Sequence, residues 1–441
     1  MAGTGPAPAP APPPESAEMV QEILLKLPTR DVMRCCCVSK LWRSIVADPT
    51  FRTLHAEAEA DHVSAAPPEA LLVTVTREPG RPDEASFFRV SSPKPTLMSH
   101  RVTIPSGYRL SNLCNGLLCF SLVRDSPEAP PFICNPVTGE TATVPKAPPP
   151  VGLPGGTIYH HFALAFSPST KEHKLFRFTF SPFYSIYGDD VDQSVFTLDG
   201  AAGGGGWRQR SFRSRCPLLV TFRPLLIQGK LYLVTTGQTG PEKPRNPDGL
   251  LEVDVATEAC RTHRLPFEAD EYHPAWHPLV NACEMDGRLC LAVDILRGVH
   301  TTVRKIQFWV LMSSLPRPDR DDSEAHWELR YSFHADNDYV FDVPRSAWFD
   351  DAEKTLCYKD YEVLYKHGTR GRSPEPSPDA DCPQCDRRIQ LPPTPSNGQW
   401  NIFGDYRPSL LSPLALTQPP SSWDGEEERQ KFEHALLLTL E

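Results

Sequence analysis

The chain has 441 residues, of which 40% are hydrophobic and 23% charged, so it can build two or more folded domains and is not wholly disordered. Its 48 prolines and 26 glycines favour many turns and short elements, which nearly excludes an all-helical fold. The formal charge of −10 gives no general attraction to nucleic acid or to an anionic membrane, and no apolar run is long enough to span a bilayer.

The N-terminal sequence and the cysteine content favour a location inside the cell. The first residues lack a basic region followed by an apolar one, which an export signal would require. The 13 cysteines, with Cys35, Cys36 and Cys37 in a row, fit reduced thiols better than a disulfide framework. We therefore expect the protein in the cytoplasm, the nucleus or both.

The N-terminal part of the chain divides into a leader and a helical segment. Residues 1–15 are rich in proline and alanine, and we expect an extended, disordered leader there. From residue 16 to residue 55, 20 of 40 residues are hydrophobic. Met19, Ile23 and Leu27 repeat at helical spacing, which predicts a first helix over 18–27.

Two or three more short helices are expected before residue 56. Pro28 ends the first helix, Thr29 can cap the second, and Ser39 can cap the third. Asp48 and Pro49 read as an N-cap and a first-turn proline of a fourth helix. A bundle of about 40 residues rarely buries enough surface to be stable alone. We therefore predict that part of its apolar surface docks onto another protein.

Beyond residue 60 the sequence changes to short β-type runs that are separated by Pro, Gly and Asp clusters. Compact apolar runs that open on a glycine or a charged residue recur at 116–120, 229–233, 287–291 and 354–358. A repeat of about 58 residues belongs to the kelch size class of propeller blades, and residues 66–415 hold about six such repeats. The expected fold is thus α+β: a small helical domain over 16–56, then a mainly antiparallel, kelch-like β-propeller over 66–415.

The C-terminal residues 423–441 differ from the β-type region. They open with acidic residues, and their apolar residues then follow helical spacing at Phe432, Leu436, Leu437 and Leu440. A short amphipathic helix is expected there.

Candidate chemical sites are few and weak. Cys382 and Cys385 have the spacing of half a zinc site, but no second pair accompanies them in this proline-rich stretch, so no metal is assigned. No nucleophile elbow, phosphate-binding loop or dinucleotide fingerprint occurs, and no spacing singles out an acid–base pair. We expect no catalytic residue and no cofactor.

The segment from Glu18 to His55 resembles an F-box. The family pattern has Ile-Leu in the first helix, Leu-Pro after it, an apolar pair before Arg, a Cys-Val-x-Lys-x-Trp core, and Asp-Pro-x-Phe at the end. The chain matches these elements in order, although it has Pro13-Pro14-Glu15 where the family usually has Leu-Pro before the first helix. The resemblance implies adaptor binding by Ile23, Leu24, Leu27, Pro28, Val32, Cys37, Val38, Lys40 and Trp42.

The rest of the chain resembles the F-box-associated domain of plant proteins. The similarity rests on short motifs in a fixed order: Asn115-Gly116-Leu117-Leu118, Asn135-Pro136-x-Thr138-Gly139, Gly229-Lys230-Leu231-Tyr232, Asp254-x-Ala256-Thr257-Glu258 and Tyr406-x-Pro408-Ser409-Leu410. Each motif is also ordinary turn chemistry, so we interpret them as blade architecture rather than as binding residues.

Together the two resemblances imply a substrate-recognition subunit of a cullin-RING (SCF-type) ubiquitin ligase. The F-box would bind a Skp-family adaptor and, through it, the cullin and RING subunits, and the β domain would bind a target protein. Two alternatives stay open: a scaffold that binds the adaptor without ubiquitination of a target, and a propeller that binds a glycan or small ligand. For the last, Trp207, Trp276 and Trp348 are available as an aromatic platform.

Overall fold

The computed structural model describes residues 16–61, 69–91, 94–122, 129–150, 159–180, 189–198, 206–214, 223–236, 247–267, 279–296, 304–316, 322–335, 347–350, 355–360, 363–368, 387–391 and 401–417. The leader expected over 1–15 and the helix expected over 423–441 lie outside these residues. Cys382 and Cys385 also lie outside them.

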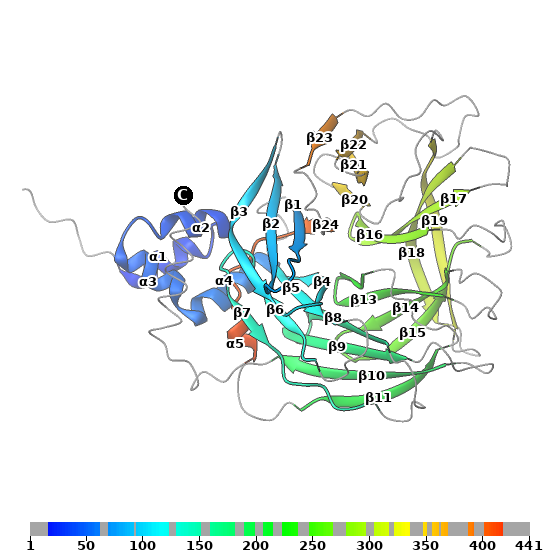
Figure 1. The fold of residues 1–441 in the computed structure, drawn as a ribbon, viewed down its shortest axis with the longest axis horizontal. Helices are drawn as coiled ribbons and strands as arrows, with labels where there is room; N and C mark the ends of the chain where they lie inside the picture. The colour runs from blue at the N-terminus through cyan, green and yellow to red at the C-terminus, as the bar shows by residue number, and fades with distance from the viewer. Residues whose placement is uncertain are drawn as a thin grey trace, which may run out of the picture.

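Four helices form an N-terminal unit, residues 16–61, which we call the helical module (Figure 1). They are α1 (Ala17–Leu24), α2 (Thr29–Cys35), α3 (Lys40–Ala47) and α4 (Pro49–Asp61). Two expected caps are confirmed: Ser39 Oγ accepts a hydrogen bond from the Trp42 amide (3.3 Å), and Asp48 Oδ1 accepts one from the Phe51 amide (3.1 Å).

The start of the module differs from expectation in two details. Helix α1 ends at Leu24 rather than at Leu27, because the Lys26 and Leu27 amides bond the carbonyls three residues back and tighten the chain into a turn before Pro28. Thr29 does not cap α2 but is its first residue, after Pro28 at the N-cap. Glu59 of α4 supplies the cap, since its Oε1 accepts a hydrogen bond from the Thr29 amide at 2.8 Å.

The remaining elements form the β domain and a short closing helix. The units, in chain order, are β1 (Glu69–Thr76), β2 (Asp83–Ser91) and β3 (Lys94–Ile104); β4 (Arg109–Cys114), β5 (Leu117–Ser121), β6 (Phe132–Cys134) and β7 (Thr141–Thr143); β8 (Tyr159–Ser167), β9 (Glu172–Phe180), β10 (Asp189–Leu198) and β11 (Arg208–Ser214); β12 (Leu225–Ile227), β13 (Lys230–Thr236), β14 (Pro247–Asp254) and β15 (Cys260–Arg264); β16 (Leu279–Met285), β17 (Arg288–Leu296), β18 (Arg304–Pro316) and β19 (Asp322–Ala335); β20 (Ala347–Asp350), β21 (Thr355–Asp360), β22 (Val363–Gly368) and β23 (Arg387–Gln390); then β24 (Asn401–Tyr406) and α5 (Pro413–Thr417).

By hydrogen bonding, the described strands make five sheets of the propeller, where about six blades were expected. Four of these sheets have four strands and one has eight. The eight-stranded sheet joins two antiparallel four-stranded units, β12–β15 and β16–β19, through a parallel pairing of β15 with β19 at Thr262 and His263. The difference in number therefore comes from two units that share one hydrogen-bonded sheet.

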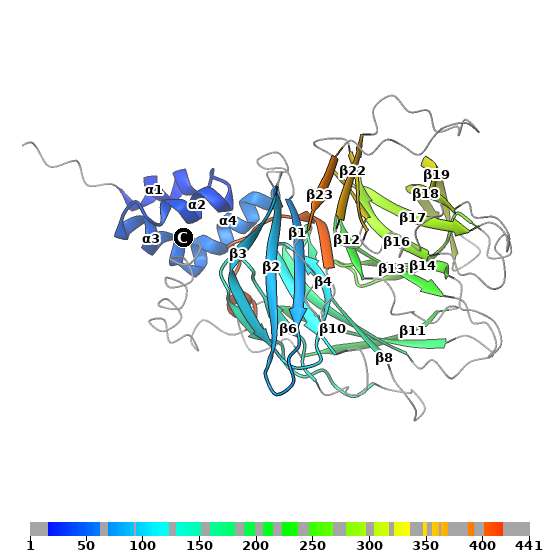
Figure 2. The same ribbon diagram turned by 45° about the horizontal axis from the view of Figure 1, so that its top comes forward.

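The last strand closes the propeller by joining the first unit. β24 pairs antiparallel with β1, with Ile402 opposite Leu72 and Asn401 opposite Val73. Figure 1 shows the units in succession, from the blue strands beside the helices, through the green ones, to the yellow and orange ones. Closure by β24 returns the chain to the side of the β domain that faces the helical module (Figure 2).

Tight hairpin turns let neighbouring segments approach each other closely. Gly116, between β4 and β5, has φ +77°, and a Cβ there would lie 2.6 Å from the Ser409 Cβ. Gly229, between β12 and β13, also has φ +77°, and its Cβ would lie 2.7 Å from the Pro168 Cδ. Glycine is required at both turns for its backbone conformation and for the space it leaves.

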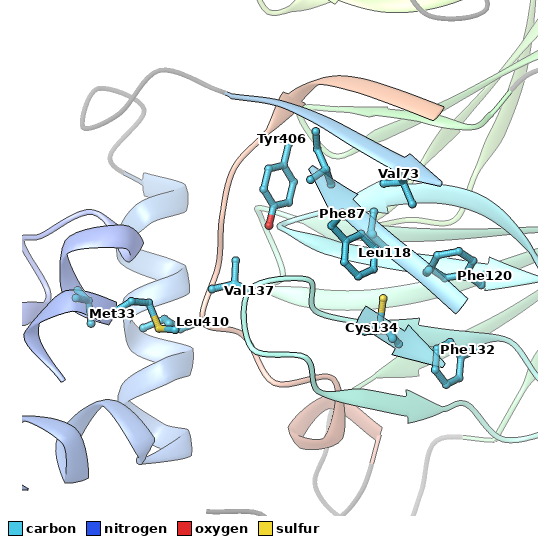
Figure 3. Close-up of a cluster of buried hydrophobic side chains, with 14 of the residues drawn as sticks. Met33, Val73, Phe87, Leu118, Phe120, Phe132, Cys134, Val137, Tyr406 and Leu410 are labelled. Atoms are coloured by element: carbon cyan, nitrogen blue, oxygen red, sulfur yellow. The ribbon is translucent and has the colours of Figure 1, made fainter. Parts of the chain in front are cut away.

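One hydrophobic cluster is continuous from the helices into the β domain. It contains Leu24 and Met33 of the module, Phe87 and Phe120 of the first two units, and Leu410 after β24. Figure 3 shows Met33 and Leu410 on the helical side of the cluster, with Val137, Phe87, Phe120 and Tyr406 deeper in the β domain. Part of the apolar surface of the helices is thus buried within this chain.

Candidate functional site

The helical module projects from one side of the β domain, with α4 nearest to the strands (Figures 1 and 2). Helices α1, α2 and α3 lie beyond α4, so they present the outer surface of the module. This outer surface is accessible to another protein.

The residues that the F-box resemblance assigns to adaptor binding fall into three groups in the structure. The side chains of Leu24 and Val32 are fully buried and pack in the core, so they hold the module together and offer no surface in this structure. Leu27, Pro28 and Trp42 are half-buried, and Ile23, Cys37, Val38 and Lys40 are exposed. The exposed members therefore come from α1, from the turn between α2 and α3, and from the first residue of α3.

Exposed apolar side chains concentrate on the module. Among the described residues, the large hydrophobic side chains that are exposed are Met19 (55%), Val38 (62%), Ile23 (42%) and Leu54 (40%). All four belong to residues 16–61, and none belongs to the described part of the β domain. Exposed apolar side chains that concentrate on one unit favour an interaction site on that unit.

Met19 is a member of this surface that the motif comparison did not include. It precedes Ile23 by four residues on α1, so both side chains lie on one face of that helix. The sequence contained this signal, because Met19 is part of the helical repeat that predicted the helix. The helical repeat alone did not show which apolar residues of α1 face the core. In the structure, Val20 and Leu24 are the buried ones.

Residues 407–412, which we call the clamp segment, connect the helical module to the β domain. The buried Arg52 of α4 donates from Nε to the Leu410 carbonyl oxygen at 2.6 Å. Its two terminal nitrogens form a bidentate ion pair with Glu140, which follows the β6–β7 turn. Bidentate pairing fixes the guanidinium in direction as well as in position.

Two other side chains hold the same segment. Asn135 donates from Nδ2 to the carbonyl oxygens of Ser409 and Leu411, both at 2.8 Å, while its Oδ1 accepts a hydrogen bond from the Val137 amide. Thr29 Oγ1 lies 3.0 Å from the Pro408 carbonyl oxygen. The clamp segment is therefore bonded to α2, to α4 and to the β6–β7 turn.

Three motifs that looked like separate blade turns meet at this place. Gly116 makes room for Ser409, Asn135 bonds the carbonyls on either side of Leu410, and Tyr406 is fully buried just before the clamp segment. Sequence reasoning treated these motifs as local turn chemistry and missed their convergence. The only signal in the sequence was their fixed order, which carries no distance information.

Buried ion pairs connect further parts of the β domain. Glu258, in the turn between β14 and β15, accepts hydrogen bonds from Lys174 of β9 (3.1 Å) and from Arg208 of β11 (2.6 Å). Burial alone would raise the Glu258 pKa, but these hydrogen bonds outweigh burial and lower it. The ionised carboxylate therefore joins one four-stranded unit to the next.

The other candidate sites take structural positions. Trp207 packs against Phe162 and Phe196 and donates from Nε1 to the Pro145 carbonyl oxygen, so this ring belongs to the packing between units. Burial lowers the pKa of His160 and of His161 to about 4, which keeps both imidazoles neutral. Trp276 lies outside the described residues, and the side chain of Trp348 is not described.

Within the described ranges, no group of three or more His, Cys, Asp or Glu side chains is arranged to hold a metal ion. No helix in the described part of the chain is long and apolar enough to cross a bilayer. Cys36, the C-cap of α2, is buried, and burial raises its thiol pKa to about 12, so it fills space as a protonated side chain.

Comparison with known proteins agrees with the two-part architecture. The F-box domain model matches residues 16–54, and the F-box associated beta propeller domain model matches residues 71–314. Among Arabidopsis thaliana proteins, F-box protein At5g65850 is 30% identical over 142 residues, which cover 29% of this chain and 31% of that protein. F-box protein DOR is 26% identical over 229 residues, which cover 49% of this chain and 53% of that protein. The chain thus spans from about a third to about half of the length of these relatives.

Proposed function

Because this chain belongs to the F-box proteins that carry an F-box associated beta propeller domain, we propose that it is a substrate-recognition subunit of an SCF-type ubiquitin ligase. The observation that carries the proposal is the position of the exposed apolar side chains. Met19, Ile23 and Val38 project from the F-box itself, where a free surface of this kind has no stabilising role in the isolated chain.

In this proposal the F-box binds a Skp-family adaptor through Met19, Ile23 and Val38, which we call the apolar set. Lys40 and Cys37 are also exposed and flank Val38 along the chain. Leu24 and Val32 act indirectly, because they hold α1 and α2 in the positions that expose this set. Trp42 is half-buried against the core and supports α3 in the same way.

The β domain binds the target protein, and the chain contributes position rather than chemistry. Ubiquitin transfer is carried out by the RING subunit and its conjugating enzyme, which reach the adaptor through the cullin. A receptor accelerates such a reaction by raising the local concentration of activated ubiquitin near the target's lysines. We place this assembly in the cytoplasm, the nucleus or both.

The test is adaptor binding by variants of the exposed residues. The double variant Ile23→Asp, Val38→Asp should lose adaptor pull-down, because each interface anchor contributes about 2 kcal/mol or more. Both side chains are exposed, so the thermal unfolding of the variant should match that of the unmodified chain. Leu54→Asp is the matched control, since it places the same charge on an exposed leucine of α4.

Two outcomes would contradict parts of the proposal. Normal adaptor binding by the double variant would remove the assigned surface. Adaptor binding without any ubiquitin conjugates in a reconstituted ligase, with proteins captured from the source tissue as targets, would favour the scaffold alternative instead.

A further inference from the structure

The apolar set is unpartnered in the free chain as far as the structure describes it. Met19 is 55% exposed and Val38 is 62% exposed. Helix α1 packs on α3, and Val38 lies in the turn that leads into α3, so the members of the set come from elements that pack on each other. An apolar surface that is needed only part of the time favours a cover for the rest of the time.

The C-terminal sequence has the composition of such a cover. At 100° per residue, Phe432, Leu436 and Leu440 fall on one side of a helix over 423–441, and Leu437 widens that stripe. Leu438 falls on the opposite side. A helix with such an apolar stripe needs a groove or a face to bury it.

The described chain ends close enough for this segment to reach the module. Leu416 of α5 and Ala56 of α4 pack against the same cluster, and the Leu410 carbonyl, seven residues before Thr417, is bonded to Arg52 of α4, so the described chain ends near the module. Residues 418–431 can span about 45 Å when extended and about 20 Å as a flexible coil. Helix α1 is only about 12 Å long, so the linker is long enough for a return to α1.

Charge also favours this contact. Residues 26–43 contain five basic residues and one acidic residue, with Lys26 and Lys40 exposed. Residues 423–441 contain six acidic residues and two basic ones. Opposite charges on the two segments steer their encounter and disfavour binding of the tail to the acidic remainder of the chain.

We propose that residues 423–441 fold back on the F-box and cover the apolar set until an adaptor displaces them. The contact is autoinhibitory, because the tail and the adaptor occupy the same surface. The competition with an adaptor rests on the proposed function above, whereas the covering of Met19 by the tail does not.

The first test therefore leaves the adaptor out. Oxidation of the Met19 sulfur by dilute peroxide, followed by mass spectrometry, reports its accessibility in the chain 1–441 and in a chain that ends at Thr417. We expect Met19 to oxidise about tenfold faster in the shorter chain. In the full chain, Leu436→Glu should speed oxidation to a similar extent, and the matched control Leu438→Glu should leave it slow. Equal oxidation rates in all four chains would overturn the proposal.

A second measurement excludes another copy of the chain as the cover. Protection of Met19 by the chain's own tail is independent of protein concentration, whereas protection by a second copy increases with it. Protection that rises with concentration, together with dimers in sedimentation, would overturn the proposal.

The third test adds the adaptor. Removal of residues 418–441 should tighten adaptor binding about tenfold, which corresponds to a covered fraction of about nine-tenths in the full chain. Faster Met19 oxidation without any change in adaptor affinity would overturn the competition. Absence of adaptor binding in every chain, with the oxidation difference intact, would reject the proposed function but not the covering of the F-box.

Discussion

Arg52 shows how a single side chain holds two domains together. Its guanidinium is buried and is paired with Glu140 and with the Leu410 carbonyl, so all three segments meet at one group. Transfer of this ion pair out of water costs free energy, which the attraction between the two charges and their hydrogen bonds must offset. The ion pair sets the orientation of α4 on the β6–β7 turn, which an apolar contact would not do because it has no preferred direction.

We predict that loss of one partner is worse than loss of both. Arg52→Met leaves the Glu140 carboxylate buried without its cation and should cost about 3 to 5 kcal/mol. Addition of Glu140→Met should restore part of that loss, because no unpaired charge then remains. Thermal unfolding of the two variants checks this, and a double variant less stable than the single one would contradict it.

Glu252 should make stability depend on pH in the acid range. Burial alone would raise its pKa, but hydrogen bonds from His263 (2.9 Å) and Lys230 (2.8 Å) outweigh burial and lower the pKa to about 2. A lowered pKa means that the stabilisation is complete above the ordinary value of 4.5 and is lost as pH falls toward 2.

The measurement is the Tm difference between the unmodified chain and Glu252→Gln as a function of pH. We expect it to be constant from pH 7 to pH 5 and to shrink between pH 4.5 and pH 2. Exposed carboxylates cannot produce this pattern, so Glu328→Gln, a half-exposed residue of β19, is the control. A pH-independent difference would show that the ionised form of Glu252 is not what stabilises the fold.

The hairpin turn between β4 and β5 affects stability because the clamp segment packs directly against it. Gly116 and Gly80 both have positive φ, at +77° and +80°, but a Cβ on Gly80 would meet nothing within 4 Å. The two positions thus separate backbone strain from crowding. Strain alone costs about 1 kcal/mol at each of them.

We predict that Gly116→Ala is clearly more destabilising than Gly80→Ala. The added methyl group at residue 116 would press on Ser409 and on the Arg407 carbonyl, which the clamp segment cannot move without loss of its hydrogen bonds. Chemical denaturation of both variants gives the difference directly. Equal destabilisation would mean that the close approach at Ser409 relaxes at little cost.

Over the whole molecule, the F-box and the C-terminal part of the chain form one folding unit. The cluster that contains Leu24 and Met33 also contains Tyr406 and Leu410, far away in sequence. Removal of β24 and of the residues that follow it should therefore disturb the helices near the N-terminus.

We predict that a chain that ends at residue 400 loses cooperative unfolding of the helical module as well as of the first unit. It lacks β24, the clamp segment and the partners of Arg52 and Thr29. A chain that ends at Thr417 keeps all of these and should retain a single cooperative transition. Limited proteolysis within residues 16–61 distinguishes the two, and equal protection would contradict the prediction.

Much of this architecture follows from local patterns along the chain. The helical spacing of Met19 and Ile23, the caps at Ser39 and Asp48, and the repeated β-type runs were sufficient for the helices and the antiparallel propeller, because these features depend on near neighbours. The family came instead from the resemblance of short ordered motifs to the F-box and its associated domain. Local patterns cannot report which side of α1 is buried or which distant segments meet. The burial of Leu24, the exposure of Ile23 and the convergence on the clamp segment were decided by long-range packing, since β24 brings Leu410 back to α4 only when the propeller closes.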